Sequence, residues 1–494
     1  MSRGYLIGVD VGTQSAKVSV FDTDGALVCY ESEPLKKLEI PAPDLAIHPG
    51  DDLWDSLVRA LHKAMGAFNK LGRDPKEILG MGICIVRCCR ALLKGNGELA
   101  HPVINWMDKR LNDPYEWVPE YGDVRWVTSA SGYITHRLTG ETKDTCANYI
   151  GWWPMDDDTC TWTTKGELLK KCKIPPHMLF DVVKPGETLG SVTERVAEIT
   201  GVPAGVPVVA TAHDKGVEAL GSGTLSEGTA LISLGTYIGA MVHGRARVPD
   251  AKSFWCFQSS IPGEWLYECM GVRRGMWTVS WFVEQFGGDL RVEAARRGVS
   301  VEELLNEEAS MIPAGSDGLV TVHDWAPPAH ATFRRGVFFG FDGRHTRAHM
   351  YRSLLEGIGL TLKNHIDPMC EELRVPLKKI VVSGGGAQSA LLTQILSDIF
   401  GVPVYRNEIA ASVGVGCAIN AGVGIGAFRS YEEGIRKMVT ARDTFTPSPE
   451  NTGLYRDINE KVYRGINRHF DPVLERLGGI DSGGRGGVSV PRTG

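Results

Sequence analysis

The chain has 494 residues, of which 43% are hydrophobic and 23% are charged. This composition is typical of a globular protein of roughly two to three domains, and it excludes fibrous and intrinsically disordered classes. Its 53 Lys and Arg against 59 Asp and Glu give a net charge of −6 without a basic tract, which argues against a nucleic-acid partner. No signal-peptide pattern and no run of about 18 apolar residues occurs, so we expect a cytoplasmic protein without a membrane partner.

The N-terminal segment Tyr5–Phe21 has the pattern of two strands joined by a small polar turn. Asp10 lies at the mouth of this turn, and a buried carboxylate needs a partner because leaving it unpaired is costly. Backbone N–H groups and the Thr13 and Ser15 hydroxyls can bind phosphate oxygens, and Asp10 can hold the Mg²⁺ that accompanies a nucleotide. The alternative is a hairpin whose Asp and Thr satisfy only their own turn. The nucleotide-binding candidates of this turn are Gly12, Thr13, Gln14, Ser15 and Lys17.

Apolar spacing predicts the next elements. It indicates a helix over 51–71 with one buried face, and a strand over 78–86 that leads into Arg87 and Cys88. After a further hairpin, residues 102–110 read PVINWMDKR.

Eleven cysteines are scattered along the chain. For the cluster of Cys84, Cys88 and Cys89 we favour buried free thiols over a metal site, because no zinc-type spacing accompanies it.

A strand predicted over 208–212 ends at His213 and Asp214, where a helix begins. Asp214 is our candidate catalytic residue, because a carboxylate at the C-terminal end of a strand can accept a proton from a reacting hydroxyl. The alternative is a helix N-cap, a role that Asp fills well, and both roles can coexist. His213 is either a substrate contact or a packed, hydrogen-bonded histidine.

The second half of the chain repeats the first motif. Ala230–Val242 again runs from an apolar strand into Gly-Thr, with Ser233 in the place of Asp10, and a third strand meets three glycines within Ile380–Gln388. Repeated strand–Gly-Thr–strand units predict two related α/β domains that face one nucleotide. The nucleotide-binding candidates in this half are Ser233, Gly235, Thr236, Gly384, Gly385, Gly386 and Gln388. Helices are predicted over 275–286, 301–311 and 351–372. The stretch 410–426 is rich in Gly and Ala, which allows close packing.

These motifs, in this order, resemble the actin-like ATPase superfamily, and within it the xylulokinase-like FGGY carbohydrate kinases, over Tyr5 to about Phe470. The resemblance implies an α/β fold of two actin-like (ribonuclease H-like) domains with ATP and Mg²⁺ in the cleft between them. We expect an N-terminal domain over 1–223 with the sugar site and catalytic Asp, a C-terminal domain over 224–475 with the nucleotide site, and a disordered tail over 476–494.

The resemblance also assigns roles to single residues. Asp214 stands where the family has its general base, and His213 stands where many relatives have a small residue. Trp106, Asp108 and Arg110 resemble the W-x-D-x-R stretch that lines the sugar site, in which an indole face and charged groups suit a sugar. The alternative is a surface ion pair between Asp108 and Arg110 beside a core tryptophan.

The substrate stays open, because the sequence departs from its subgroups. Arg87 matches an arginine of glycerol kinases, whereas Cys88 replaces a histidine of xylulokinases. Only 26 residues, Leu111–His136, separate Arg110 from the RLTG stretch at 137–140, where other members fit extra helices and a sugar-covering segment. A shortened lid could widen or expose the site, or weaken the enzyme.

We therefore expect ATP-dependent phosphorylation of a hydroxyl on a small sugar or polyol, with a ketopentose such as xylulose as first choice. The stretches 416–422 and 446–455 also resemble autoinducer-2 kinases, so a hydroxy-diketone stays open, as do glycerol and other polyols and a homodimeric assembly. The rival class is a non-catalytic ATP-binding protein of the actin type. Asp214 and the 106–110 stretch argue against it, because such a protein needs no sugar-site carboxylate.

Overall fold

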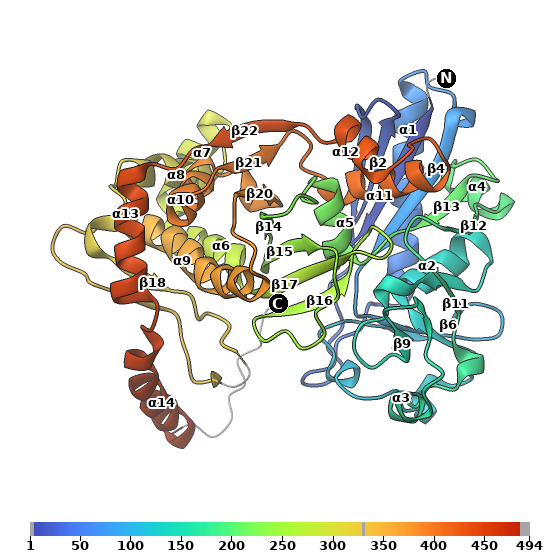
Figure 1. Cartoon of the computed structure of the whole chain (residues 1–494), viewed down its shortest axis with the longest axis horizontal. Coiled ribbons are helices and arrows are strands. Elements are labelled where there is room, and N and C mark those ends of the chain that lie inside the picture. The colour runs from blue at the N-terminus through green and yellow to red at the C-terminus, as the bar shows by residue number, and fades with distance from the viewer. Residues whose placement is uncertain (1–3, 329–330, 485–494) are drawn as a thin grey trace.

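The computed structural model describes residues 4–328 and 331–484, and it contains two large mixed sheets, each flanked by helices (Figure 1). The first is six-stranded, in the order β12-β13-β4-β1-β2-β3. Its strands are β1 (Tyr5–Val11), β2 (Ser15–Asp22), β3 (Leu27–Pro34), β4 (Ile78–Ile85), β12 (Thr188–Ser191) and β13 (Pro207–Ala210). The second is seven-stranded, in the order β16-β17-β15-β14-β20-β21-β22. Its strands are β14 (Thr229–Leu234), β15 (Ile238–Gly244), β16 (Phe254–Gln258), β17 (Trp265–Val272), β20 (Lys379–Ser383), β21 (Val404–Asn407) and β22 (Ala441–Phe445).

The two sheets share one plan of strand pairing. In the first, β1 pairs antiparallel with β2 and parallel with β4. In the second, β14 pairs antiparallel with β15 and parallel with β20 in the same way. The repeated hairpin seen in the sequence is therefore a repeated structural unit. The predicted two-domain actin-like α/β fold is confirmed, and we keep 1–223 and 224–475 as our proposed division, because the two sets of strands fall on either side of it.

Small sheets and helices complete the fold. The small sheets contain β5 (Arg90–Leu93), β6 (Leu99–Ile104) and β7 (Trp126–Ser129), with the pairs β8 (Lys143–Thr145) and β11 (Asp181–Val183), β9 (Met155–Asp156) and β10 (Thr161–Trp162), and β18 (Val320–Val322) and β19 (Val337–Phe339). The helices are α1 (Asp52–Lys70), α2 (Ala130–Thr139), α3 (Gly166–Cys172), α4 (Glu194–Thr200), α5 (Asp214–Gly221), α6 (Gly275–Phe286), α7 (Arg291–Arg297), α8 (Val301–Ser310), α9 (Arg347–Leu373), α10 (Ala390–Phe400), α11 (Ser412–Gly424), α12 (Tyr431–Met438), α13 (Pro449–Ile458) and α14 (Asn467–Gly484). Within the described residues, none of these helices combines the length and the apolar character that crossing a membrane requires.

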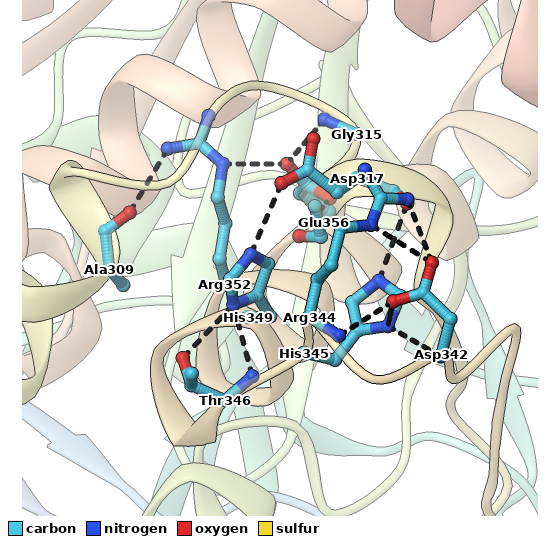
Figure 2. Close-up of polar contacts among 11 residues, drawn as sticks. Ala309, Gly315, Asp317, Asp342, Arg344, His345, Thr346, His349, Arg352 and Glu356 are labelled. Atoms are coloured by element: carbon cyan, nitrogen blue, oxygen red, sulfur yellow. Dashed lines mark hydrogen bonds and ion pairs between the residues drawn. The ribbon is translucent and has the colours of Figure 1, made fainter.

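Helix α9 begins one turn earlier than its apolar spacing predicts. Figure 2 shows the polar cluster at its start, where the Thr346 N–H donates to His349 Nδ1 at 3.1 Å and His349 Nε2 lies 3.2 Å from Asp317 Oδ2. Further along, Arg352 Nε donates to Glu356 Oε1 at 2.8 Å. These polar contacts order the first turn and fasten it to the loop around Asp317. An apolar period cannot indicate them, because the residues that make them are polar.

Helix α11 belongs to the second half of the chain, but it packs against the first sheet. Its Val415 and Ile419 share a buried cluster with Leu6 of β1 and Leu220 of α5, and Figure 1 shows α11 and α12 beside β2 and β4. Small residues permit this approach. A Cβ added to Gly221 of α5 would lie 1.8 Å from the Ser412 carbonyl oxygen.

The expected disordered tail is corrected in part. Helix α14 runs from Asn467 to Gly484, so the part of the tail between 476 and 484 is helical. Glycine and serine in this stretch lower helix propensity without forbidding a helix. Residues 485–494 lie outside the described residues.

Gly82 of β4 gives a test of the close packing of α11. An added Cβ would lie 2.1 Å from the carbonyl oxygen of Cys417, a backbone atom that cannot swing away. We expect Gly82→Ala to destabilise the protein by about 1–3 kcal/mol, the usual cost of overpacking. The matched control is Gly66→Ala in α1, where an added Cβ meets nothing within 4 Å and should stabilise the helix by about 0.5–1 kcal/mol. Urea unfolding measures the free energy of unfolding of both variants. Equal changes in the two variants would contradict the close packing of α11 on β4.

Candidate active site

The candidate site forms where the parallel strands of both sheets end. In the first sheet β1, β4 and β13 run parallel, so Asp10 near the end of β1, Arg87 after β4 and Asp214 after β13 lie at one edge. In the second sheet Ser233 of β14 is in register with Ser383 of β20, and Gly235 and Gly384 follow them. Ligands of α/β proteins bind at such carboxyl ends of strands.

Asp214 begins helix α5, but it is not the residue that caps it. The cap is His213, whose Nδ1 accepts the N–H of Gly216 at 3.3 Å. The interpretation of Asp214 as a mere N-cap is therefore wrong. Its side chain is 35% exposed, and its Oδ1 is buried, lies 3.3 Å from Arg87 Nε and accepts no hydrogen bond within the described residues. A carboxylate with free acceptor capacity at the strand ends suits a general base.

Charges near Asp214 keep it ionised. Burial raises the pKa of this carboxyl, but the positive charges of Arg87 and Lys215 outweigh burial and hold the pKa below its ordinary value. Burial, aided by Arg87, lowers the pKa of His213 to about 3, so this imidazole is neutral at physiological pH. Its ring packs edge-on against Phe257 at 5.5 Å between centroids. His213 is thus a packed capping residue, and a sugar contact by it stays a prediction.

Arg87 joins the two domains. Its Nη1 and Nη2 lie 2.9 Å from Oε2 and 3.0 Å from Oε1 of Glu268, which stands on β17 of the second sheet. Its guanidinium also lies over the Phe257 ring at 5.4 Å. Glu268 is not among the site residues predicted from the sequence. The available signal was a single acidic residue inside the otherwise apolar strand WLYECMGV.

A second polar network ties the start of α5 to the second domain. Lys215 Nζ donates to Glu218 Oε2 and to Ser233 Oγ, both at 2.8 Å. The Ser383 hydroxyl donates to Glu218 Oε1 at 2.6 Å. Burial lowers the pKa of Lys215, but Glu218 and Asp214 more than compensate and raise it to about 12. Three of these residues, Lys215, Glu218 and Ser383, were missed because the contacts of Lys215 with Ser233 and of Glu218 with Ser383 depend on the two domains meeting.

Asp10 lies beside Lys17, whose Nζ is 3.0 Å from Asp10 Oδ2. Burial raises the pKa of the Asp10 carboxyl even though Lys17 opposes the rise. In the part of the chain that the structure describes, no group of three or more His, Cys, Asp or Glu could hold a metal ion. Mg²⁺ that arrives with ATP needs only one or two carboxylates besides phosphate and water. Asp10, with its 16% exposed side chain at the mouth of the turn, fits that requirement.

The predicted sugar segment reaches the phosphate turn. Trp106 is half exposed, and its indole N–H donates to Thr13 Oγ1 at 3.2 Å. Asp108 is buried, accepting the Ala46 N–H at 2.7 Å and two N–H groups of Arg110 at 2.8 and 2.9 Å. The ion pair between Asp108 and Arg110 that the alternative predicted is therefore present, but its surface position and the core position of the tryptophan are wrong, because Asp108 is buried and Trp106 is half exposed. Asp108 braces Arg110, and direct contact of this pair with a sugar stays a prediction.

The remaining predicted residues lie around this edge. Cys88 has a left-handed backbone (φ 56°), and burial raises the pKa of its thiol although Arg87 opposes the rise. The short segment 111–136 contains β7 and most of α2, and its own Tyr115 and Tyr121 are buried in a hydrophobic cluster. Gly12–Ser15 and Gly384–Gln388 occupy the turns after β1 and β20. Nucleotide binding by these turns stays a prediction.

Together, the paired sheets and the carboxylate between them define an actin-like phosphotransferase. The chain belongs to the FGGY family of carbohydrate kinases. The N-terminal domain profile of that family matches residues 5–125 and 120–221, and the C-terminal domain profile matches residues 230–425. The uncharacterized sugar kinase YgcE of Escherichia coli K12 is 44% identical over 490 residues, covering 98% of this chain and 99% of that protein.

Solved structures show the same fold. A gluconate kinase of Lactobacillus acidophilus superposes with a TM-score of 0.82 at 18% identity, covering 96% of this chain and all of that one. A ligand-bound xylulose kinase of the same organism gives a TM-score of 0.81, also at 18% identity and with the same coverage. At such identity the likeness shows the fold, and the predicted class of enzyme, a carbohydrate kinase, is confirmed by the family.

The pH dependence of the enzyme offers a test of the Asp214–Arg87 contact. In Arg87→Met the main charge that lowers the pKa of Asp214 is gone, so burial dominates and the pKa rises. Because the base works deprotonated, the acid limb of kcat/KM should move to higher pH than in wild type. A pH profile of both enzymes measures the shift. An unmoved acid limb would show that Arg87 does not set the ionisation of Asp214, or that Asp214 is not the general base.

Proposed function

We propose that the protein transfers the γ-phosphoryl group of ATP to a terminal hydroxyl of a small sugar or polyol, with a ketopentose such as xylulose as first candidate. The observation that carries this proposal is the partly exposed, ionised Asp214 at the strand ends, next to Lys215, which contacts Ser233 of the second domain. A cytoplasmic location, where ATP is made and used, is part of the proposal.

The residues suggest how the reaction would proceed. Asp214 accepts the proton of the substrate hydroxyl. The oxygen of that hydroxyl forms a bond to the γ-phosphorus, and the bond between the γ-phosphorus and the β-phosphate oxygen breaks, which leaves ADP. Arg87 keeps Asp214 ionised and oriented. The turns after β1 and β14 hold the phosphates in line, which supplies most of the catalysis in phosphoryl transfer. Mg²⁺, held at Asp10, would neutralise phosphate charge.

A substrate panel tests the proposal. Purified enzyme with Mg·ATP is given pentuloses, polyols, glycerol and linear hydroxy-diketones one at a time, and ADP release is recorded. We expect at least one ketopentose to raise ADP release far above the rate with ATP alone. A preference for the hydroxy-diketone would move the substrate to the autoinducer-2 class. No stimulation by any member would contradict the proposed substrate class.

A further inference from the structure

Glu268 is a buried carboxylate in an apolar strand. It is 2% exposed and stands opposite Met241 in the β15–β17 pair. Figure 1 shows that β17, the strand that carries it, lies on the side of the second sheet that approaches the first half of the chain. Its partner, Arg87, comes from the other domain. Burying a carboxylate costs free energy, and a protein tolerates this cost when the carboxylate is paired with a cation. The contact with Arg87 therefore links the second domain to the group that orients Asp214.

One guanidinium thus serves two carboxylates. Arg87 places Nη1 and Nη2 on Glu268 and Nε on Asp214. The fork that Arg normally offers to an anionic ligand is therefore occupied from two sides. The three side chains together carry a net charge of about −1, counting each as fully ionised.

The other two cations described near Asp214, Lys215 and Lys17, are also paired within the protein. Lys215 is held by Glu218 and Ser233, and Lys17 is held by Asp10. A ligand that carries its own carboxylate would therefore lie near the negative charges of Asp214 and, behind Arg87, of buried Glu268, with no uncommitted cation among these groups. Repulsion between these like charges disfavours binding of the charged ligand, and a neutral polyol avoids the repulsion.

We infer that Glu268 is a specificity-determining positioning residue, which acts through Arg87 and makes the site accept neutral polyhydroxy substrates and reject sugar acids. The inference rests on the proposed function, and it narrows the substrate to uncharged ketoses and polyols. By occupying two nitrogens of Arg87, Glu268 removes the anion-binding fork. Replacing Glu268 with Gln keeps the shape of the side chain and removes its negative charge, so the positive charge of Arg87 becomes available to an anionic ligand.

The test compares wild type, Glu268→Gln and the charge-keeping control Glu268→Asp. D-xylulose and D-gluconate are the probes, with calorimetric affinity and ADP release as readouts. We expect wild type and Glu268→Asp to bind D-gluconate at least about tenfold more weakly than Glu268→Gln. The kcat/KM ratio of D-xylulose to D-gluconate should fall at least as much in Glu268→Gln. A merely structural role would weaken both probes together and leave this ratio unchanged.

Several outcomes would overturn the inference. One is wild-type enzyme that binds or phosphorylates D-gluconate as well as D-xylulose, a result that needs no variant to fold. Another is equal D-gluconate affinity in wild type and folded Glu268→Gln, with folding checked by the melting temperature. If wild type phosphorylates no sugar or polyol, the proposed function fails, and the D-gluconate affinities of the variants still decide the role of Glu268.

Discussion

Replacing Asp214 with Asn is expected to lower turnover by about 10²–10⁴-fold, the usual contribution of one positioned base. The amide keeps the shape of the side chain but cannot accept the proton of the substrate hydroxyl. Affinity for Mg·ATP should change little, because the nucleotide candidates lie on the turns after β1, β14 and β20. The melting temperature should also change little, because His213 caps helix α5 and Arg87 keeps its contact with Glu268.

One purified variant is enough to measure turnover, Mg·ATP affinity and melting temperature. The matched control is Asp55→Asn, an exposed carboxylate in the first turn of α1, which should keep wild-type turnover. If Asp214→Asn retains turnover while folded, Asp214 is not the general base. A large loss of stability together with turnover would instead assign it a structural role.

Replacing Asp10 with Ala is expected to weaken Mg·ATP binding by about 10–100-fold, the range found when groups that support a bound metal are removed. Asp10 lies at the mouth of the first turn, and its carboxylate is the metal candidate there. The same substitution frees Lys17, which can then attract phosphate. Affinity for ATP without Mg²⁺ should therefore stay the same or rise.

Calorimetry with ATP, once with Mg²⁺ and once with a chelator, separates these effects. In wild type the metal should strengthen binding, and in Asp10→Ala that gain should largely vanish. The chelator arm is the internal control for damage to the turn itself. An equal gain from Mg²⁺ in both proteins would remove Asp10 from the metal site.

Local patterns made much of the fold and site predictable. The hairpins around Asp10 and Ser233 show in the sequence because strand alternation and a Gly-Thr turn are short-range signals. Helix α6 was predicted with its observed bounds, Gly275–Phe286. Asp214 became the catalytic candidate because it closely follows a predicted strand, and the structure places it at the end of β13, where α5 begins.

Contacts between distant segments could not be predicted in this way. The pairing of Arg87 with Glu268 and of Lys215 with Ser233 joins residues on two domains, and no local pattern specifies how domains meet. The packing partner of helix α11 could not be predicted for the same reason. Its glycines indicated close packing, but the partner surface on β1, β4 and α5 belongs to the first half of the chain.

The central claim, phosphoryl transfer from ATP to a sugar hydroxyl, is tested most directly by ³¹P NMR of wild-type enzyme with Mg·ATP and D-xylulose. We expect a growing phosphomonoester signal that matches the amount of ADP formed, and we expect this signal to be lost in the Asp214→Asn variant. Other neutral ketoses and polyols are run in the same way if D-xylulose is not the substrate. ADP formed only together with inorganic phosphate, at one rate with and without every sugar tried, would contradict the account.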